Sequence, residues 1–203
     1  MAEKRKKWIA VFCASMDGAK AEYLATARAM GRAIAERGYG MVYGGATVGA
    51  MGAVADGALK AGGAVVGVIP DVIMDLEIGH RGLTELHVVR TMHERKALQA
   101  ERADAFVALP GGYGTMDEFI EIVTWAKLRI HAKPCVLVNT GGFYDGLLEF
   151  LDRCVSEGFL KQQHRDLVLV ARDVDEALAI VEREWGARAE VPPHDKRLDE
   201  LVK

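Results

Sequence analysis

The sequence feature that most constrains the fold is a short apolar run followed by a glycine-rich turn and an amphipathic helix. The apolar run is Ala105–Leu109, and its length and its position before a turn predict a strand buried in a parallel sheet. The turn follows at Pro110–Gly114. Beyond it, apolar residues recur at three- and four-residue steps, which predicts a helix: Phe119, Ile122, Val123, Ala126 and Ile130.

This turn also predicts an anion site. A helix start presents backbone N–H groups without an intrahelical partner, together with the positive end of the helix dipole. Gly111, Gly112 and Gly114 would let a phosphate approach the backbone, and Thr115 adds a hydroxyl group. A tight turn without a ligand would explain the glycines alone. The proline, the three glycines, the threonine and the two acids together favour binding.

The order of strand, loop and helix recurs along the chain. We predict strands at residues 8–13, 41–43, 64–69, 85–89, 105–109, 134–138 and 167–170. We predict the main helices at 20–36, from the second glycine turn to about 61, 92–102, after 114, 144–157 and 174–185. This alternation predicts an α/β fold with a doubly wound parallel sheet of about seven strands and helices on both faces. Residues 71–84 are irregular and are interpreted as a surface loop able to cover a site.

The length of 203 residues indicates a single domain, 1–203. We expect its basic start (1–7) and its charged end (187–203) to be loosely ordered. The formal net charge of −3 gives no reason to expect nucleic-acid or membrane binding, and no apolar run reaches the roughly 18–20 residues of a membrane span. Three widely separated cysteines without metal-ligand spacing indicate reduced thiols in the cytoplasm. The six histidines are scattered, so we expect no metal site.

A second glycine-rich turn, Gly44–Gly52, is another candidate anion site. It fits neither the GxxxxGK[ST] phosphate loop nor the GxGxxG dinucleotide fingerprint. In an open parallel sheet, ligands bind beyond the carboxyl ends of the strands, where the loops after Cys13, Tyr43, Val89 and Leu109 would converge.

Two charged residues add chemistry to these loops. Glu118 lies one helical turn beyond Gly114, about 6 Å along the axis, which is close to the span of one sugar. Its carboxylate would therefore meet the ribose of a nucleotide whose phosphate occupies the helix start, and Arg95 from the preceding helix would reach the same place. A carboxylate and a guanidinium beside a ribose suit cleavage of its bond to the base, because that reaction builds positive charge on the sugar and needs an oriented water.

The segments Thr91–Lys96 (TMHERK) and Pro110–Glu118 (PGGYGTMDE) resemble the motifs of the LOG family, the cytokinin riboside 5′-monophosphate phosphoribohydrolases once misannotated as lysine decarboxylases. The resemblance covers about residues 8–185. It implies a Rossmann-like homodimer, without a cofactor, that hydrolyses a nucleoside 5′-monophosphate to the free base and ribose 5-phosphate. The expected substrate is AMP, an N6-modified cytokinin riboside monophosphate, or both.

The resemblance also implies site residues. Arg95 and Glu118 match the family's catalytic arginine and acid. The other matched positions are expected to bind substrate: Ser15, Gly44, Gly45, Met92, Lys96, Gly111, Gly112, Gly114 and Thr115.

The chain departs from the family pattern at two places. Asp117 stands where the family usually has a glutamate, and we expect altered support for the site rather than lost activity. In the first loop, Ala14 and Met16 depart from an FCGSS-like pattern, which changes how the backbone would approach the ligand.

Two other functions compete with hydrolysis. The same phosphate cradle would serve a nucleotide-binding or carrier protein that performs no chemistry, although Arg95 and Glu118 argue against it. A pyridoxal-dependent decarboxylase is the other, but no lysine has an identifiable pyridoxal-phosphate context.

Overall fold

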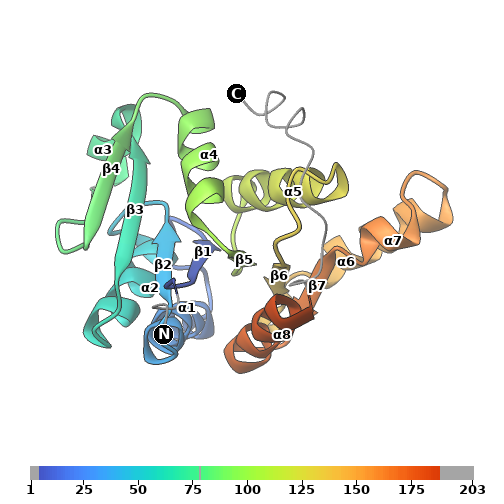
Figure 1. Ribbon diagram of the computed structural model, residues 1–203, viewed down its shortest axis with the longest axis horizontal. Helices are drawn as coiled ribbons and strands as arrows, with labels where there is room; N and C mark the ends of the chain where they lie inside the picture. The colour runs from blue at the N-terminus through green and yellow to red at the C-terminus, as the bar shows by residue number, and fades with distance from the viewer. Residues whose placement is uncertain (1–4, 78, 188–203) are drawn as a thin grey trace.

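The computed structural model describes residues 5–77 and 79–187, and within them the chain forms one parallel sheet between two layers of helices (Figure 1). The strands are β1 (Trp8–Phe12), β2 (Gly40–Tyr43), β3 (Val65–Pro70), β4 (Glu85–Val89), β5 (Ala105–Ala108), β6 (Cys135–Val138) and β7 (Val168–Ala171). The helices are α1 (Ala21–Glu36), α2 (Gly49–Lys60), α3 (Asp71–Glu77), α4 (Met92–Arg102), α5 (Tyr113–Lys127), α6 (Asp145–Ser156), α7 (Gln162–Arg165) and α8 (Val174–Ala187), with a 3₁₀ turn, η1 (Thr140–Gly142).

The seven predicted strands and the α/β class are confirmed. The strand order is β4-β3-β2-β1-β5-β6-β7, and every pairing is parallel. The order runs outward from β1 in both directions, so the sheet is doubly wound. Ile9 of β1, for example, pairs with Met41 of β2 on one side and with Ala105 of β5 on the other.

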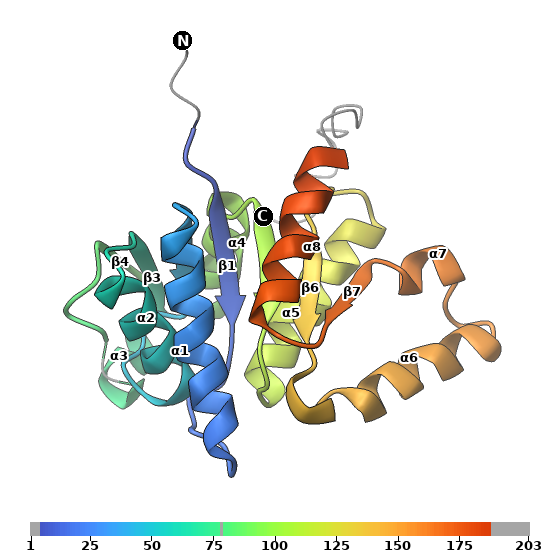
Figure 2. The same ribbon diagram turned by 90° about the horizontal axis from the view of Figure 1, so that it is seen from below.

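The core has two halves, one on each face of the sheet. Because successive strand residues point to opposite faces, Ile9 and Val11 pack in one half, with buried residues of α1, α2 and α8, whereas Ala10 and Phe12 pack in the other, with residues of α4 and α5. Figure 1 shows α1, α2 and α8 below the sheet and α4 and α5 above it. Figure 2, seen from below, shows α6 and α7 extending away from the sheet.

The interpretation of residues 71–84 as an irregular loop was wrong in its first half. Pro70 is the last residue of β3, and α3 begins at Asp71, whose carboxylate accepts a hydrogen bond of 2.6 Å from the N–H of Val72. The segment then docks on the second glycine turn, where Ala46 and Gly79 form an isolated antiparallel bridge. A helix of seven residues shows too little periodicity for sequence reasoning to detect.

Two further short elements were not predicted, η1 and α7. The expectation for the chain ends falls largely on residues 1–4 and 188–203, which lie outside the described residues. Of the basic start, Arg5 and Lys7 both contact the carboxylate of Asp104, at 2.7 and 3.5 Å. No helix in the described part of the chain is long and apolar enough to cross a membrane.

Candidate active site

The candidate site lies where the sheet changes direction, beyond the carboxyl ends of β1 and β5. These strands are neighbours, but the chain leaves β1 toward β2 and leaves β5 toward β6. The loops after the two strands therefore diverge and leave room for a ligand between them, as in other doubly wound sheets. The glycine turn after β5 leads into α5 at this point, and α4 lies beside it (Figure 1).

Helix α4 is fixed at its start by a reciprocal cap. The hydroxyl of Thr91 accepts a hydrogen bond of 3.1 Å from the N–H of Glu94, and the carboxylate of Glu94 accepts one of 2.8 Å from the N–H of Arg90. The spacing of Thr91 and Glu94 is that of a capping box. The hydrogen bond from the N–H of Arg90 is the largest cause of a lowered pKa of the Glu94 carboxyl group. With its start fixed, α4 turns Arg95 and Lys96 inward, and both are buried.

Arg95 and Glu118 form an ion pair between α4 and α5. Nη2 of Arg95 lies 3.4 Å from Oε1 of Glu118, and the two side chains are only 7% and 8% exposed. Nε of Arg95 is buried and makes no hydrogen bond to any described residue, and Nη1 lies 4.0 Å from Sδ of Met92. The guanidinium thus keeps polar atoms available for a ligand beside the carboxylate. The two residues predicted to be catalytic are brought together by the fold.

Gly44 lies against this pair. A Cβ atom at residue 44 would collide with Nη2 of Arg95 and would come within 2.6 Å of Sδ of Met51. Any residue other than glycine at position 44 would displace the guanidinium of Arg95. The structure therefore puts Gly44, at the end of β2, next to Arg95 as the predicted site requires.

Lys96 ties the two helices together one residue further along. Its ammonium group lies 3.1 Å from Oδ2 of Asp117 and 3.1 Å from Oε1 of Glu121, and its side chain is 9% exposed. Burial acts to lower the pKa of Lys96, but the hydrogen bonds and charges of Asp117 and Glu121 outweigh it, and the pKa is raised. Asp117 thus braces Lys96, and the two acids flank Glu118 along α5.

A contact between Gly111 and Thr115 fixes the shape of the turn between β5 and α5. A Cβ atom at residue 111 would collide with the hydroxyl of Thr115, whereas at Gly112 and Gly114 it would meet nothing within 4 Å. The Thr115 hydroxyl is buried and has no hydrogen-bond partner in the part of the chain that the structure describes. Helix α5 begins at Tyr113, so a ligand can approach the free N–H groups of its first turn past two glycines with open space around them.

The second glycine turn is less accessible to an anion than we predicted, because another loop covers it. The N–H groups of Ala50 and Met51, in the first turn of α2, donate to the carbonyls of Met16 and Ala14 at 3.4 and 3.1 Å. Gly49 adopts a φ of +59°, and a Cβ atom there would come within 2.5 Å of Met16 N. The loop after β1 therefore covers the start of α2, and α5 offers the more accessible helix start.

Ser15 and Gly45, two of the predicted binding residues, lie at the edges of this arrangement. Ser15 is exposed in the loop that covers α2. Gly45 has a φ of +82°, and a Cβ atom there would lie 3.1 Å from Cβ of Ile69 and 3.3 Å from a methyl group of Leu86. Packing against β3 and β4 accounts for this glycine, and its contact with substrate stays a prediction.

Sequence reasoning missed three residues around the ion pair. Cys13 ends the first strand segment; burial raises the pKa of its thiol, the charge of Glu118 adds to the effect, and Arg95 opposes it. Gln99, one turn after Arg95, is 1% exposed, and neither polar atom of its amide has a hydrogen-bond partner among the described residues. Glu121 holds Lys96. The spacing of Gln99 from Arg95 and of Glu121 from Glu118 along the two helices is a signal that could have found these two, whereas Cys13 directly follows β1 and carries no such signal.

No group of three or more His, Cys, Asp or Glu side chains able to hold a metal ion occurs among the described residues. The site's polar atoms are instead a guanidinium, an ammonium, carboxylates, a hydroxyl and backbone N–H groups. This donor set suits a phosphate and a sugar.

Comparison with known proteins agrees with the motifs. A family model described as "Possible lysine decarboxylase" matches residues 51–181. The cytokinin riboside 5′-monophosphate phosphoribohydrolase of Rhodococcoides fascians is 49% identical over 176 residues, which cover 86% of this chain and 89% of that protein. The LOG enzyme of the same name from Oryza sativa is 46% identical over 83% of this chain and 71% of its own length.

Solved structures share the fold. The molybdenum cofactor carrier protein of Chlamydomonas reinhardtii is 26% identical with a TM-score of 0.67, over 90% of this chain and 99% of that one. The molybdenum cofactor binding protein of Rippkaea orientalis, at 21% identity and a TM-score of 0.68 over 89% of this chain and 98% of that one, shows the fold alone.

Proposed function

The chain belongs to the family of the cytokinin riboside 5′-monophosphate phosphoribohydrolases, the LOG family, and from this membership and the site geometry we propose how it works. It is a hydrolase of N-glycosyl bonds that releases the base of a nucleoside 5′-monophosphate and leaves ribose 5-phosphate. The observation that carries the proposal is the buried ion pair of Arg95 and Glu118, 3.4 Å apart beside the start of α5.

The substrate phosphate binds at the start of α5. The open space around Gly112 and Gly114 supports this, as does the buried hydroxyl of Thr115, which has no hydrogen-bond partner within residues 5–77 and 79–187. The helix dipole and the free N–H groups of the first turn favour a dianion there. Gly111, packed on Thr115, sets the shape of the turn.

With the phosphate at this point, the ribose lies over Glu118. Four residues of α5 separate Gly114 from Glu118, about 6 Å along the axis. As the bond to the base breaks, positive charge develops on the sugar, and the carboxylate of Glu118 stabilises it and orients the attacking water. The water's oxygen bonds to the sugar carbon as one of its protons passes to the carboxylate. The base leaves with the electrons of the N-glycosyl bond and takes up a proton, and Glu118 gives up the proton it received, which restores the carboxylate.

Arg95 keeps Glu118 in place. Its positive charge offsets the cost of burying the carboxylate, and its Nε, which has no hydrogen-bond partner among the described residues, is a donor for substrate. Lys96 and Met92 complete this side of the pocket. Lys96 acts mainly by fixing α4 to α5, because its ammonium group is already shared by Asp117 and Glu121.

A carrier function without chemistry is less well supported. The relatives at 40–49% identity are named as hydrolases, whereas the carrier protein is 26% identical. A carrier would also have no use for a carboxylate held one turn from the phosphate. The decarboxylase description of the family model finds no support at Lys96, the buried lysine beside the site, which is held by two carboxylates.

The finer features are proposals as well. We propose AMP and N6-prenylated AMP as substrates and a homodimer as the working form, consistent with the exposure of Ile120 on α5 and of Leu128 directly after it. The three free cysteines support a reducing location, the cytoplasm. The net charge of −3 supports a small-molecule substrate rather than nucleic acid or a membrane surface.

A substrate panel tests the function. The protein is incubated with AMP, isopentenyladenosine monophosphate and adenosine, and the release of free base is followed by chromatography. We expect base from one or both monophosphates and little from adenosine, which lacks the phosphate. Binding of the monophosphates without release of any base would overturn the proposal in favour of a carrier.

A further inference from the structure

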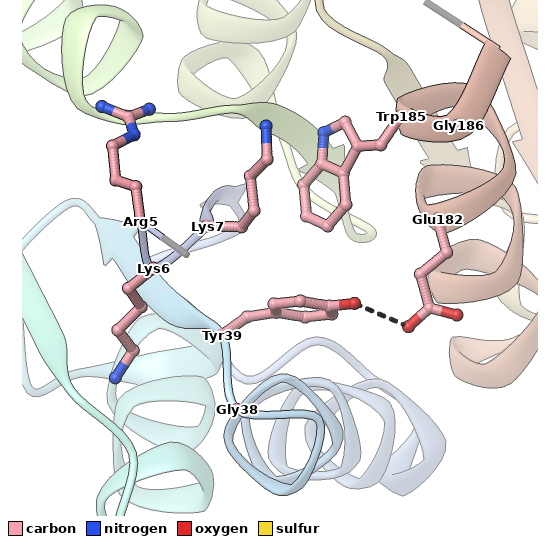
Figure 3. A pocket seen from close by; sticks show the side chains of 8 residues that line it. All are labelled: Arg5, Lys6, Lys7, Gly38, Tyr39, Glu182, Trp185 and Gly186. Atoms are coloured by element: carbon pink, nitrogen blue, oxygen red, sulfur yellow. Dashed lines mark hydrogen bonds between the residues drawn. The ribbon is translucent and has the colours of Figure 1, made fainter. Parts of the chain in front are cut away.

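A cavity lies at the amino ends of strands β1 and β2, whereas Arg95 and Glu118 lie beyond the carboxyl ends of the strands. Its volume is about 480 Å³, within the range of small-molecule sites. It is lined by side chains from three places in the chain: the segment before β1, the turn between α1 and β2, and the end of α8 (Figure 3). The residues that matter are Arg5, Lys6, Lys7, Tyr39, Glu182 and Trp185.

Two aromatic rings form its apolar part, and the protein holds both. Tyr39 and Trp185 meet edge to face, with ring centroids 5.1 Å apart and planes at 82°. The indole N–H of Trp185 donates to the carbonyl of Asp104 at 2.9 Å, and the hydroxyl of Tyr39 donates to Glu182 at 3.1 Å. Because their polar atoms are already bonded, the rings offer a ligand their apolar surfaces in a fixed arrangement.

The other part of the cavity is basic. Arg5 and Lys7 share the carboxylate of Asp104, at 2.7 and 3.5 Å, which holds this segment against the protein. Each keeps donors that Asp104 does not use, since a guanidinium has five N–H groups and an ammonium three. Lys6 adds a third positive charge, and its Nζ lies 5.8 Å from the centre of the Trp8 ring.

The cations and the rings also adjoin one another. Nζ of Lys7 lies 5.3 Å from the centre of the Trp185 ring, and Figure 3 shows the two side chains next to each other above Tyr39. The acid in the lining, Glu182, is engaged by the Tyr39 hydroxyl and lies 3.5 Å from Nε of Arg37. Basic side chains therefore outnumber acidic ones where a ligand would bind.

We propose that this cavity is a second binding site, for a small ligand that joins a planar aromatic ring to a phosphate. The ring packs on Tyr39 and Trp185, the phosphate accepts hydrogen bonds from Lys7 and Arg5, and Lys6 adds a nearby positive charge. The site is separate from the hydrolytic centre and stands independently of the function proposed for it. A neutral ring would lack the phosphate contacts, and inorganic phosphate would lack the ring contacts.

The test uses ADP as the probe and the indole N–H resonance of Trp185 as a local reporter. The resonance is assigned with Trp185→Phe in the ¹⁵N-labelled full chain. We expect ADP to shift it saturably, and pyrophosphate and adenosine to do so at least tenfold more weakly. The same shift should appear in Glu118→Gln, because the hydrolytic centre is at the other edge of the sheet.

A charge-reversal variant locates the contact. Lys6→Glu combined with Lys7→Glu should weaken the ADP-dependent shift at least tenfold and leave base release from AMP unchanged. Lys127→Glu combined with Lys161→Glu changes the net charge equally at exposed lysines outside the cavity, and it should bind ADP like the wild type. An unmoved Trp185 resonance, equal weakening in both double variants, or equal binding of pyrophosphate and ADP would overturn the proposal.

Discussion

Gly44 and Arg95 are fitted to each other: the guanidinium of Arg95 occupies the space where a side chain at residue 44 would begin. Gly44→Ala should therefore displace Arg95 from Glu118 while the chain still folds, because the atoms that must move are the ends of two flexible side chains, Arg95 and Met51. We expect the rate of base release to fall by about 10² or more, since a small misplacement of a catalytic group has this effect.

The control for this change is Gly146→Ala. A Cβ atom at Gly146, in α6, would meet nothing within 4 Å, so a methyl group there should leave activity unchanged. Steady-state kinetics and circular dichroism of both variants are the measurements. A Gly44→Ala enzyme with normal activity would contradict the proposal that Gly44 is needed to leave space for the guanidinium of Arg95.

Glu118→Gln should abolish most turnover and spare binding. The amide keeps the shape of the side chain but can neither accept a proton nor stabilise the charge on the sugar. A loss of about 10²–10⁴-fold in kcat is expected for such a group. Calorimetric titration with AMP checks binding, and Glu101→Gln, an exposed acid on α4, should retain the wild-type rate. A near-normal rate in Glu118→Gln would refute its role.

Lys96→Met should loosen α4 from α5. It removes the cation shared by Asp117 and Glu121, so a loss of about 2–3 kcal/mol in the free energy of unfolding is expected, below the full value for a buried pair because Asp117 is 55% exposed. Urea denaturation measures it, and Lys127→Met, an exposed lysine at the end of α5, is the control. Equal stabilities of the two variants would show that the bridge contributes nothing.

The same bridge predicts a pH dependence. The folded state raises the pKa of Lys96 above its usual 10.5, so its contribution to stability is fully present below that value and is lost as the pH rises through the folded pKa. Between pH 9 and about 12, the difference in unfolding free energy between the wild type and Lys96→Met should therefore shrink. A difference that stays constant over this range would argue against the ion pairs.

Tyr144→Phe should destabilise the protein, because Tyr144 supports Leu109, the residue directly before the glycine turn at residues 110–114. The buried hydroxyl of Tyr144 donates to the carbonyl of Leu109 at 2.6 Å, and burial raises the pKa of this tyrosine. Phenylalanine would leave that carbonyl buried without this partner, at a cost of about 1–3 kcal/mol. Thermal unfolding measures the loss. Tyr113→Phe is the control, because Tyr113 is 98% exposed and should lose almost nothing.

Local sequence patterns were sufficient for the sheet, whereas the central pair also needed the family resemblance. The seven strands follow from short apolar runs before turns. The rule that loops converge at the carboxyl edge of a parallel sheet allows Arg95 and Glu118 to meet, but spacing alone fits a surface position for Arg95 better, and the motif that contains it decided between the two. The start of α4 was also predictable, because Thr91 and Glu94 carry the spacing of a capping box.

Features that depend on contacts between distant segments could not be predicted. The covering of the α2 start by Ala14 and Met16 rests on backbone hydrogen bonds, to which the side-chain pattern gives no clue beyond the glycine at residue 49. The seven residues of α3 show too little periodicity to be detected, and the bridge that follows the helix joins Gly79 to Ala46, a residue far back in the chain. Lys96 matches a motif that indicates substrate binding, and only the structure shows that Asp117 and Glu121 hold it.

The position of β1 in the middle of the sheet has a consequence for how the molecule acquires its activity. Its neighbour β5 lies far along the chain; the N–H of Trp8, for example, bonds to the carboxylate of Asp104, 96 residues away. Closing a loop of this length is a slow step in folding because its entropic cost is met before the contacts form. Arg95 and Glu118 thus come together only after that closure, and a nascent chain that has produced the first four strands and α4 contains half of a catalytic centre.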